Sequence, residues 1–596
     1  MLNRTLLNAF RHELRFLREV GAEFAAAYPQ FGGALATDAE GAGDPFVERL
    51  LEGVAFLTAK TACRLDAEGE RLASDVLRAT MPDLLHPLPP AAMVQFRPIH
   101  SLLATASARV PRGSALNYRG DSGQTIAFRS VSEVELLPLQ LRVLPAPEHT
   151  LRQHVFQAPA VRQGGRWLGQ CDVVRVELST LEGQSLADSL RERLPIHFSG
   201  PDAFTLWSAL TQHAQALLLV NPEQGGAVVA QHAQPRLLAS GWRDNEALLP
   251  DDCVLPGPYR LLREWAHWPE RFACAQVQAL PRSLAGFQGT RLELWWLVRK
   301  GAVPTQPAAD SMRLFCTPAV NVERLRCDPV TMSPNTVEYP AALPALLAQR
   351  YRIMAVDRVS CRTGNARWRE LRPLHQMFRS SGVEHYAVRV LPRWSTPLGR
   401  AGAAELEWLV APSVQANPAQ PAGDVLAMDV WASRVSVSEV LADDASRWRL
   451  EHSAPVLGVD GVGFAVAGQS VPVASSAMLR SALARFEQLM HLPPEEAAQT
   501  LQQWLSGICD GFFLPAVQAL RMTLAVRCAP WASRPVHAQG LQLSFEMDPL
   551  TEADERVSGW LHIVAATVAR QLSGQAFVCA RCMVQDRQLA ECVVWQ

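Results

Sequence analysis

Met81-Pro-Asp-Leu-Leu-His-Pro-Leu-Pro-Pro90 is the stretch at which this chain of 596 residues changes its hydrophobic period. Proline lacks an amide hydrogen and fixes φ, so the prolines crowded into this stretch end any helix that reaches them. Before the stretch, apolar residues recur at helical spacing, whereas from Ala91 onward they alternate as in strands. The stretch therefore predicts a boundary between a helical segment and a β-rich region.

The segment before this boundary is predicted to be helical. Its first helix carries one apolar stripe with spacings of three, four or seven residues: Leu6, Phe10, Leu14, Leu17 and Phe24. Pro29 ends this helix, and Asp44-Pro45 begins a second one as an N-cap followed by proline at the first helical position. A third helix is expected over about 70–80. The stripe has two interpretations that the sequence leaves open, because it fits either a core face or a face that packs into a helical bundle with a partner.

The whole chain is predicted to be an α+β multidomain protein. We expect four parts: an N-terminal helical segment over 1–90, a β-rich domain with a helical insertion over 91–310, a mixed α/β domain over 311–422, and an α+β C-terminal domain over 423–596. The helical insertion is expected at 202–218 and a Pro/Ala linker at 411–423. Helices are expected at 475–491 and 494–508, and a final amphipathic helix at 557–572.

The composition is that of a globular chain, with 48% hydrophobic and 19% charged residues. A net charge of −2 gives no global attraction to nucleic acid or to an anionic membrane. Charged residues such as Arg4, Arg11 and Glu13 interrupt any signal-peptide core, and we see no apolar run of about 18 residues that would predict a membrane span. The 12 cysteines are scattered, which favours reduced thiols. We therefore expect a cytoplasmic protein with no nucleic-acid partner and no membrane insertion.

One motif points to a possible metal site. Cys579-Ala-Arg-Cys582 is a CxxC pair, with Cys592 and His562 near it in sequence. Structural zinc needs four ligands, and this spacing matches no common zinc pattern. The chain contains neither HExxH nor GxSxG. We expect no catalytic residues and no cofactor; the alternative is a metal-dependent multidomain hydrolase with its site near Cys579 and Cys582. A binding module in the β-rich middle is a further alternative, although no regularly spaced aromatic residues support it.

Several stretches occur in an order that is more specific than any single motif. They lie across about 10–360, and include Arg15–Pro29, Asp44–Leu57, Leu88–Phe96, Val110–Gly113, Gly241-Trp242, Glu246–Pro250, Gly257–Glu264, Pro269–Phe272, Cys316–Asn321, Asp328-Pro329, Glu338–Pro340 and Ala355–Val359. This set resembles the TssF family, also called VasA or ImpG, of type VI secretion baseplate subunits. Beyond the linker the resemblance is partial, in Trp448–Leu450 and Gly559–Leu561.

The resemblance implies a structural role, similar to that of a phage baseplate wedge subunit. Family members assemble with TssG, TssE, TssK and a second copy of TssF into wedges. The wedges surround the VgrG hub, template the sheath proteins and the inner tube, and dock on the cytoplasmic side of the inner-membrane complex. The resemblance also favours the partner interpretation of the stripe formed by Leu6, Phe10, Leu14, Leu17 and Phe24.

Overall fold

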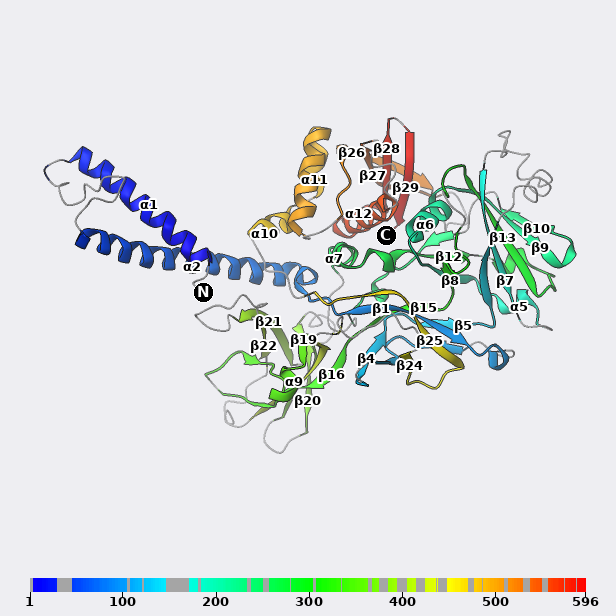
Figure 1. Cartoon of the computed structure of the whole chain (residues 1–596), viewed down its shortest axis with the longest axis horizontal. Coiled ribbons are helices and arrows are strands. Elements are labelled where there is room, and N and C mark those ends of the chain that lie inside the picture. Colours follow the sequence, from blue (N-terminus) through cyan, green and yellow to red (C-terminus); the bar gives the residue numbers. More distant parts are fainter. Residues whose placement is uncertain are drawn as a thin grey trace.

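The fold is given by a computed structural model (Figure 1). The structure describes residues 4–28, 30, 45–103, 108–120, 123–145, 171–180, 184–232, 237–249, 257–278, 280–303, 307–333, 335–362, 367–374, 384–393, 405–413, 424–435, 437, 447–469, 476–484, 486–508, 513–528, 536–548, 556–572, 574–585 and 587–595. These residues form a helical N-terminal part, a β-rich middle and an α+β C-terminal part. The predicted fold class is therefore confirmed.

The N-terminal part is an arm made of two long helices, α1 (Arg4–Ala27) and α2 (Pro45–Thr80). The arm extends away from the rest of the molecule, and the two helices lie farther apart toward its free end (Figure 1). The prediction of a separate third helix over 70–80 is wrong, because α2 continues without a break for 36 residues. Its middle lacks a regular apolar stripe, but Ala, Leu, Arg and Glu are strong helix formers and carry the helix through.

The proline-rich stretch ends α2 at Thr80, as predicted, and leads through a short helix, η1 (Pro82–Leu85), into the first strand. That strand belongs to a closed barrel with the order β1 (Ala91–Pro98), β15 (Cys316–Val320), β4 (Thr125–Ser130), β3 (Ala115–Arg119), β24 (Trp448–Leu450) and β25 (Val456–Val466). The barrel thus joins strands from three of the four expected parts. The division into four parts stays a prediction. The barrel itself was not predicted, because pairing between distant strands leaves no local signal in the sequence.

Two further sheets pack beside the barrel. The first has the order β10 (Ala227–His232), β9 (Ala214–Asn221), β13 (Arg291–Arg299), β7 (Cys171–Ser179) and β6 (Gln140–Leu144); the second has β11 (Leu237–Ala239), β12 (Cys274–Gln278), β8 (Arg193–Phe198) and β14 (Met312–Arg313). The inserted helix α6 (Ala203–Gln212) ends before 218, so that part of its prediction is wrong. Leu217, Leu218 and Leu219 are all buried in β9. A strand buried on both faces shows no alternation, and its apolar run cannot be told from a helix.

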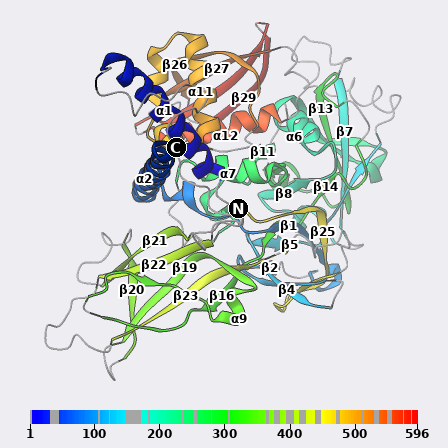
Figure 2. The same ribbon diagram turned by 60° about the vertical axis from the view of Figure 1, so that its left-hand side comes forward.

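A large separate sheet forms its own lobe beside the barrel, at the lower left of Figure 2. Its strands are β16 (Glu323–Arg326), β23 (Val425–Arg434), β19 (Tyr351–Arg362), β20 (Arg369–Pro373), β21 (His385–Arg393), β22 (Glu405–Ser413) and β18 (Tyr339–Pro340), with β17 (Val330–Thr331) paired to β23. Its core is a cluster of its own around Val359, Met428 and Val430. Most of the expected linker lies outside the described residues, and 411–413 belong to β22.

The C-terminal part is a four-stranded sheet with helices packed against it. The strand order is β26 (Val517–Cys528), β27 (His537–Met547), β28 (Phe577–Val584) and β29 (Arg587–Trp595). The parallel pair β27–β28 needs a crossover, and α12 (Val557–Gln571) supplies it. Helix α11 (Pro494–Ile508) and the final helix α12 confirm their predictions. The helix expected at 475–491 is divided into α10 (Ser476–Leu483) and η8 (Phe486–His491).

The remaining short elements connect these sheets. They are η2 (His100–Leu103), β2 (Ala108–Val110), β5 (Val134–Leu136), α5 (Leu186–Ser189), η3 (Pro222–Gln224), η4 (Asp244–Glu246), α7 (Arg260–His267), η5 (Pro269–Phe272), α8 (Leu280–Ser283) and α9 (Ala345–Ala348). Among the described residues, no helix combines the length and the apolar character needed to cross a bilayer.

Candidate functional site

The arm carries the residues that the sequence singled out for a partner interface. Leu6, Phe10, Leu14 and Leu17 are half-buried, and α2 is the element against which α1 packs. Phe24 lies near the free end of α1 and is 42% exposed. The structure therefore divides the predicted stripe, since most of it lies within the arm and its last member faces solvent. Its role as a partner interface stays a prediction.

A second set of apolar residues on the arm was missed from the sequence. Along α1 and at the residue after its end, Phe16, Val20, Phe24 and Tyr28 follow one another at a spacing of four and are all exposed. Along α2, the exposed apolar residues are Phe46, Leu50, Val54, Phe56, Leu57, Leu65 and Leu72. Phe46 and Leu50 are 80% and 69% exposed. The spacing of four was readable in the sequence, but the sequence did not show which face α2 would cover.

The contact between α1 and α2 explains why so much apolar surface remains open. α2 turns small residues inward, and Ala55 and Ala59 are fully buried. Small side chains let two helices approach closely but bury little area. Arg18 and Glu48 add an ion pair of 2.9 Å between the helices. Contiguous apolar patches of this kind on a single chain mark an interaction surface.

A buried ion cluster centred on Glu264 of α7 lies close to the base of the arm. Its Oε2 accepts hydrogen bonds from Arg271 Nη1 at 2.6 Å and from Arg260 Nη1 at 3.0 Å. Its Oε1 accepts the backbone N–H of Leu248 at 3.2 Å. Burial raises the pKa of Glu264, but the two guanidiniums outweigh that effect and hold the pKa below its ordinary value. Glu264 is therefore a carboxylate that needs both arginines.

Hydrogen bonds connect this cluster to η4, to α12 and to η1. Asp244 accepts from Arg260 at 3.3 Å and from Arg570 of α12 at 2.7 Å, which ties in the C-terminal part. Asp83 of η1, just beyond the arm, accepts the backbone N–H of Tyr259 at 2.7 Å. We call these five residues, together with Glu264 and Arg271, the anchor: Asp83, Asp244, Tyr259, Arg260, Glu264, Arg271 and Arg570.

Tyr259 links the anchor to the helices of the C-terminal part. Its hydroxyl donates to the carbonyl of Ala482 in α10 at 2.8 Å and accepts from Gln571 at 2.6 Å. Gly257 is required beside it, because a Cβ at that position would lie 2.0 Å from the carboxyl carbon of Asp83. The chain thus enters α7 pressed directly against the base of the arm.

Aromatic rings close the anchor on the side of α12. Trp242 stacks on Phe272 with centroids 4.8 Å apart and on His562 at 5.0 Å. Gly559 leaves room for Trp265, since a Cβ there would lie 2.2 Å from the indole. Stretches quoted for the family resemblance, which are far apart in sequence, therefore meet at one place in the interior.

A surface ion cluster also holds α2 against the separate lobe. Arg389 of β21 donates to both carboxylate oxygens of Asp75, at 3.2 and 2.9 Å. It also lies 3.3 Å from Glu338. A bidentate arginine fixes direction as well as distance, so we expect this contact to restrict the angle between arm and lobe.

The structure does not support the metal-dependent alternative. Cys579 and Cys582 are three residues apart on β28, and side chains at that separation on a strand point to opposite faces. Accordingly, the Cys579 thiol donates to Glu591 at 3.3 Å, whereas the Cys582 sulfur lies 3.3 Å from that of Met547. Burial, with Glu591 beside it, raises the pKa of Cys579 to about 11. His562 stacks on Trp242 instead. Within the described part of the chain, no group of three His, Cys, Asp or Glu side chains could hold a metal ion.

Known proteins match this chain over most of its length. A curated relative, the type VI secretion system component TssF1 of Pseudomonas aeruginosa, is 30% identical over 372 residues. The match takes in 60% of this chain and 58% of the relative, so the chain spans somewhat over half of that protein's length.

Two solved structures have a similar fold. One is a type VI secretion TssK-TssF-TssG baseplate subcomplex seen by cryo-electron microscopy, with a TM-score of 0.65 and 16% identity over 91% of this chain and 98% of the matched chain. The other is a type VI secretion baseplate complex, with a TM-score of 0.51 and 18% identity over 99% of this chain and 98% of the matched chain. The family model described as "Type VI secretion system, TssF" matches residues 2–590, and the chain therefore belongs to the type VI secretion system TssF family.

Proposed function

We propose that this chain is a structural subunit of a type VI secretion baseplate and that its helical arm joins it to partner subunits. The observation that carries the proposal is the exposed apolar surface of α1 and α2, on an arm that extends away from the body. Burying a Leu or Phe side chain is worth about 1.5–3 kcal/mol. Several such residues on one arm supply the energy of a stable assembly contact.

The occupant of this surface is a set of helices from TssG and from a second copy of this chain. Both helices of the arm carry exposed apolar residues along their length, and they diverge toward the free end (Figure 1). An apolar helix face recognises another helix through residues spaced three or four apart. TssG and TssK accompany TssF in the similar subcomplex.

The other assignments rest on family membership. TssE, the VgrG hub and the sheath proteins are the further partners, and TssK binds the assembled wedge. The complex lies in the cytoplasm on the inner-membrane side of the secretion apparatus. The protein acts by holding partners in place and carries out no reaction itself.

Co-purification with TssG tests the arm. Leu50 and Leu65 of α2 are 69% and 63% exposed, so replacing both with glutamate leaves the fold of the free chain intact. We expect the Leu50→Glu/Leu65→Glu variant to lose TssG, because the charges would be buried in the bundle. Leu346→Glu is the matched control, since Leu346 is 79% exposed on α9 of the lobe. Retention of TssG by the double variant at the level of the control would refute the arm as the interface.

A further inference from the structure

A polar cleft lies where the C-terminal sheet meets the sheet that contains β9 and β13. It encloses about 560 Å³, within the roughly 300–1,000 Å³ of typical ligand sites. Its lining includes Gln212, Gln215, Arg299, Arg527, Gln588 and Glu591. The cleft lies in the body and shares no residue with the arm or with the anchor, so the proposed assembly contact leaves it unexplained.

The positive charge around the cleft exceeds the negative charge. Glu591 is the acidic residue of the lining, and it is paired with Arg527 and lies 3.6 Å from Arg581. Arg299 adds a further guanidinium from the opposite wall, and the exposed Lys300 follows it. A cleft with a surplus of one sign of charge concentrates groups of the other sign.

His213, which also lines the cleft, is affected by the same positive charges. Burial, together with the nearby Arg299 and Arg587, lowers the pKa of His213 to about 4. His213 is therefore neutral at pH 7. Its ring adds no charge, while the arginines around it keep the potential positive.

The uncharged part of the lining suits a peptide. Gln212, Gln215 and Gln588 present side-chain amides, which can both donate to and accept from a peptide backbone. Gln212 already makes such a contact, because its Oε1 accepts the backbone N–H of Glu591 at 3.4 Å across the junction. Small-molecule sites, in contrast, are lined mainly by apolar and aromatic side chains.

We propose that this cleft is a docking site for an acidic segment of a partner protein, whose carboxylates pair with Arg299 and Arg527. An arginine and a carboxylate form two parallel hydrogen bonds, which gives direction to the contact. The segment would bridge β13 and β26, and would thereby link the C-terminal sheet to the sheet that contains β13. The site is additional to the arm and does not depend on TssG.

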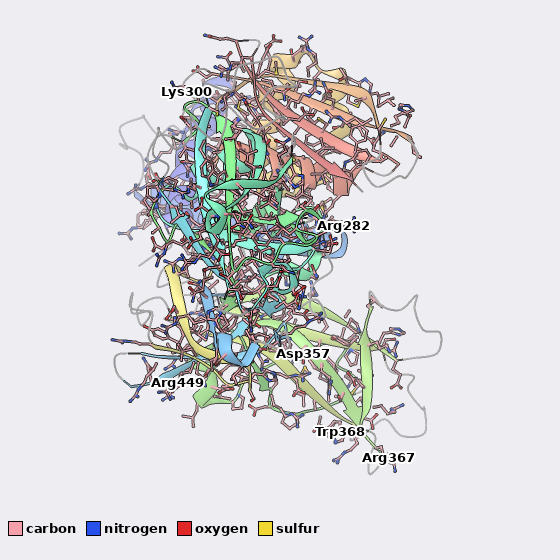
Figure 3. All side chains as sticks on the ribbon, turned by 90° about the vertical axis from the view of Figure 1, so that its right-hand side faces the viewer. Arg282, Lys300, Asp357, Arg367, Trp368 and Arg449 are labelled. Carbon is pink, nitrogen blue, oxygen red and sulfur yellow. The ribbon has the colours of Figure 1, made fainter. Side chains whose placement is uncertain are left out.

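Binding of a fluorescein-labelled hexaglutamate peptide to the purified full chain tests the proposal by fluorescence anisotropy. We expect binding that weakens with added salt, and a Kd raised at least about tenfold by Arg299→Glu. Arg282→Glu is the control, because Arg282 is an exposed arginine paired with Glu192 and lies far from Lys300, the neighbour of Arg299 (Figure 3). It should change the Kd by less than about twofold.

A second variant keeps the test independent of any folding defect in Arg299→Glu. Gln588 is exposed at the rim, so Gln588→Glu adds a negative charge without disturbing the core, and should raise the Kd several-fold. Three outcomes would overturn the proposal: no binding of the peptide by the unaltered chain, equal binding by both cleft variants and the control, or displacement of the peptide by equimolar inorganic phosphate. The last result would identify a small-anion site.

Discussion

The anchor predicts a large loss of stability when Glu264 becomes glutamine. The change keeps the shape of the side chain but removes its charge, and the side chain is only 3% exposed. Arg271 is then buried without its ion-pair partner, while Arg260 keeps an ion pair with the half-exposed Asp244 and hydrogen bonds to the carbonyls of Trp242 and Arg243. Removing one partner of a buried pair costs about 3–5 kcal/mol. We expect Glu264→Gln to lose about 4 kcal/mol of the free energy of unfolding.

Urea unfolding followed by tryptophan fluorescence measures this loss, since Trp242 and Trp265 lie against the anchor. The slope is about 2 kcal/mol per molar urea for small proteins and rises with size, so the midpoint should fall by at most about 2 M. Glu192→Gln is the matched control. Glu192 also pairs with an arginine, but on the surface, where such a pair contributes less than about 1 kcal/mol.

The same comparison has a defined pH dependence. The pKa of Glu264 is lowered in the folded chain, so its contribution is present above the unfolded pKa of about 4.3 and is lost as the pH falls through the folded value. The gap between the unaltered chain and Glu264→Gln should therefore be full at pH 7 and should close in acid. An equal midpoint for Glu264→Gln and Glu192→Gln at pH 7 would refute the role given to the anchor.

Three further predictions concern the arm and its surroundings. Gly257→Ala should lower the free energy of unfolding by about 1–3 kcal/mol, because its Cβ meets the carboxyl of Asp83. Gly53→Ala should raise it by about 0.5–1 kcal/mol, because the new methyl group on α2 has open space around it. The melting temperatures of the two variants should therefore shift in opposite directions. Arg389→Ala should release Asp75 and broaden the distribution of distances between spin labels on the arm and on the lobe, and an unchanged distribution would exclude the ion pair as the element that sets the angle. Prolonged EDTA treatment should leave the thermal unfolding curve unchanged, and a lower melting temperature would reveal a structural metal.

The sequence predicted the elements whose signals are local. Prolines mark the end of α2 at Thr80, and the amphipathic period of 557–572 marks α12. It failed where burial or pairing is decided by distant residues. The wholly apolar β9 has no alternation because both of its faces are covered, and the barrel pairs β1 with β25, more than half the chain away.

The candidate site was predicted in the same uneven way. The stripe from Leu6 to Phe24 placed the predicted interface on α1, but the outward residues Phe16 and Val20 could be identified only once the face covered by α2 was known. The CxxC pair suggested a metal site that the structure does not support, because the spacing of two ligands predicts a site only when the secondary structure between them is known. On a turn both thiols can face one metal, whereas on β28 they cannot.

The division between arm and anchor follows from one physical requirement. An arm that offers its apolar faces to a partner cannot use those faces to fix itself to its own body. Its orientation must come from its base, where Leu77 is buried in the core, Asp75 pairs with Arg389, and η1 is tied through Asp83 to Tyr259. Charged hydrogen bonds suit this task, because they hold one geometry, whereas an apolar contact tolerates sliding. A chain with Glu264→Gln should therefore still bind TssG through its arm, but should form wedges of irregular geometry in electron micrographs. Loss of TssG binding in that variant, with the arm still helical by circular dichroism, would show that the anchor and the interface are not separate.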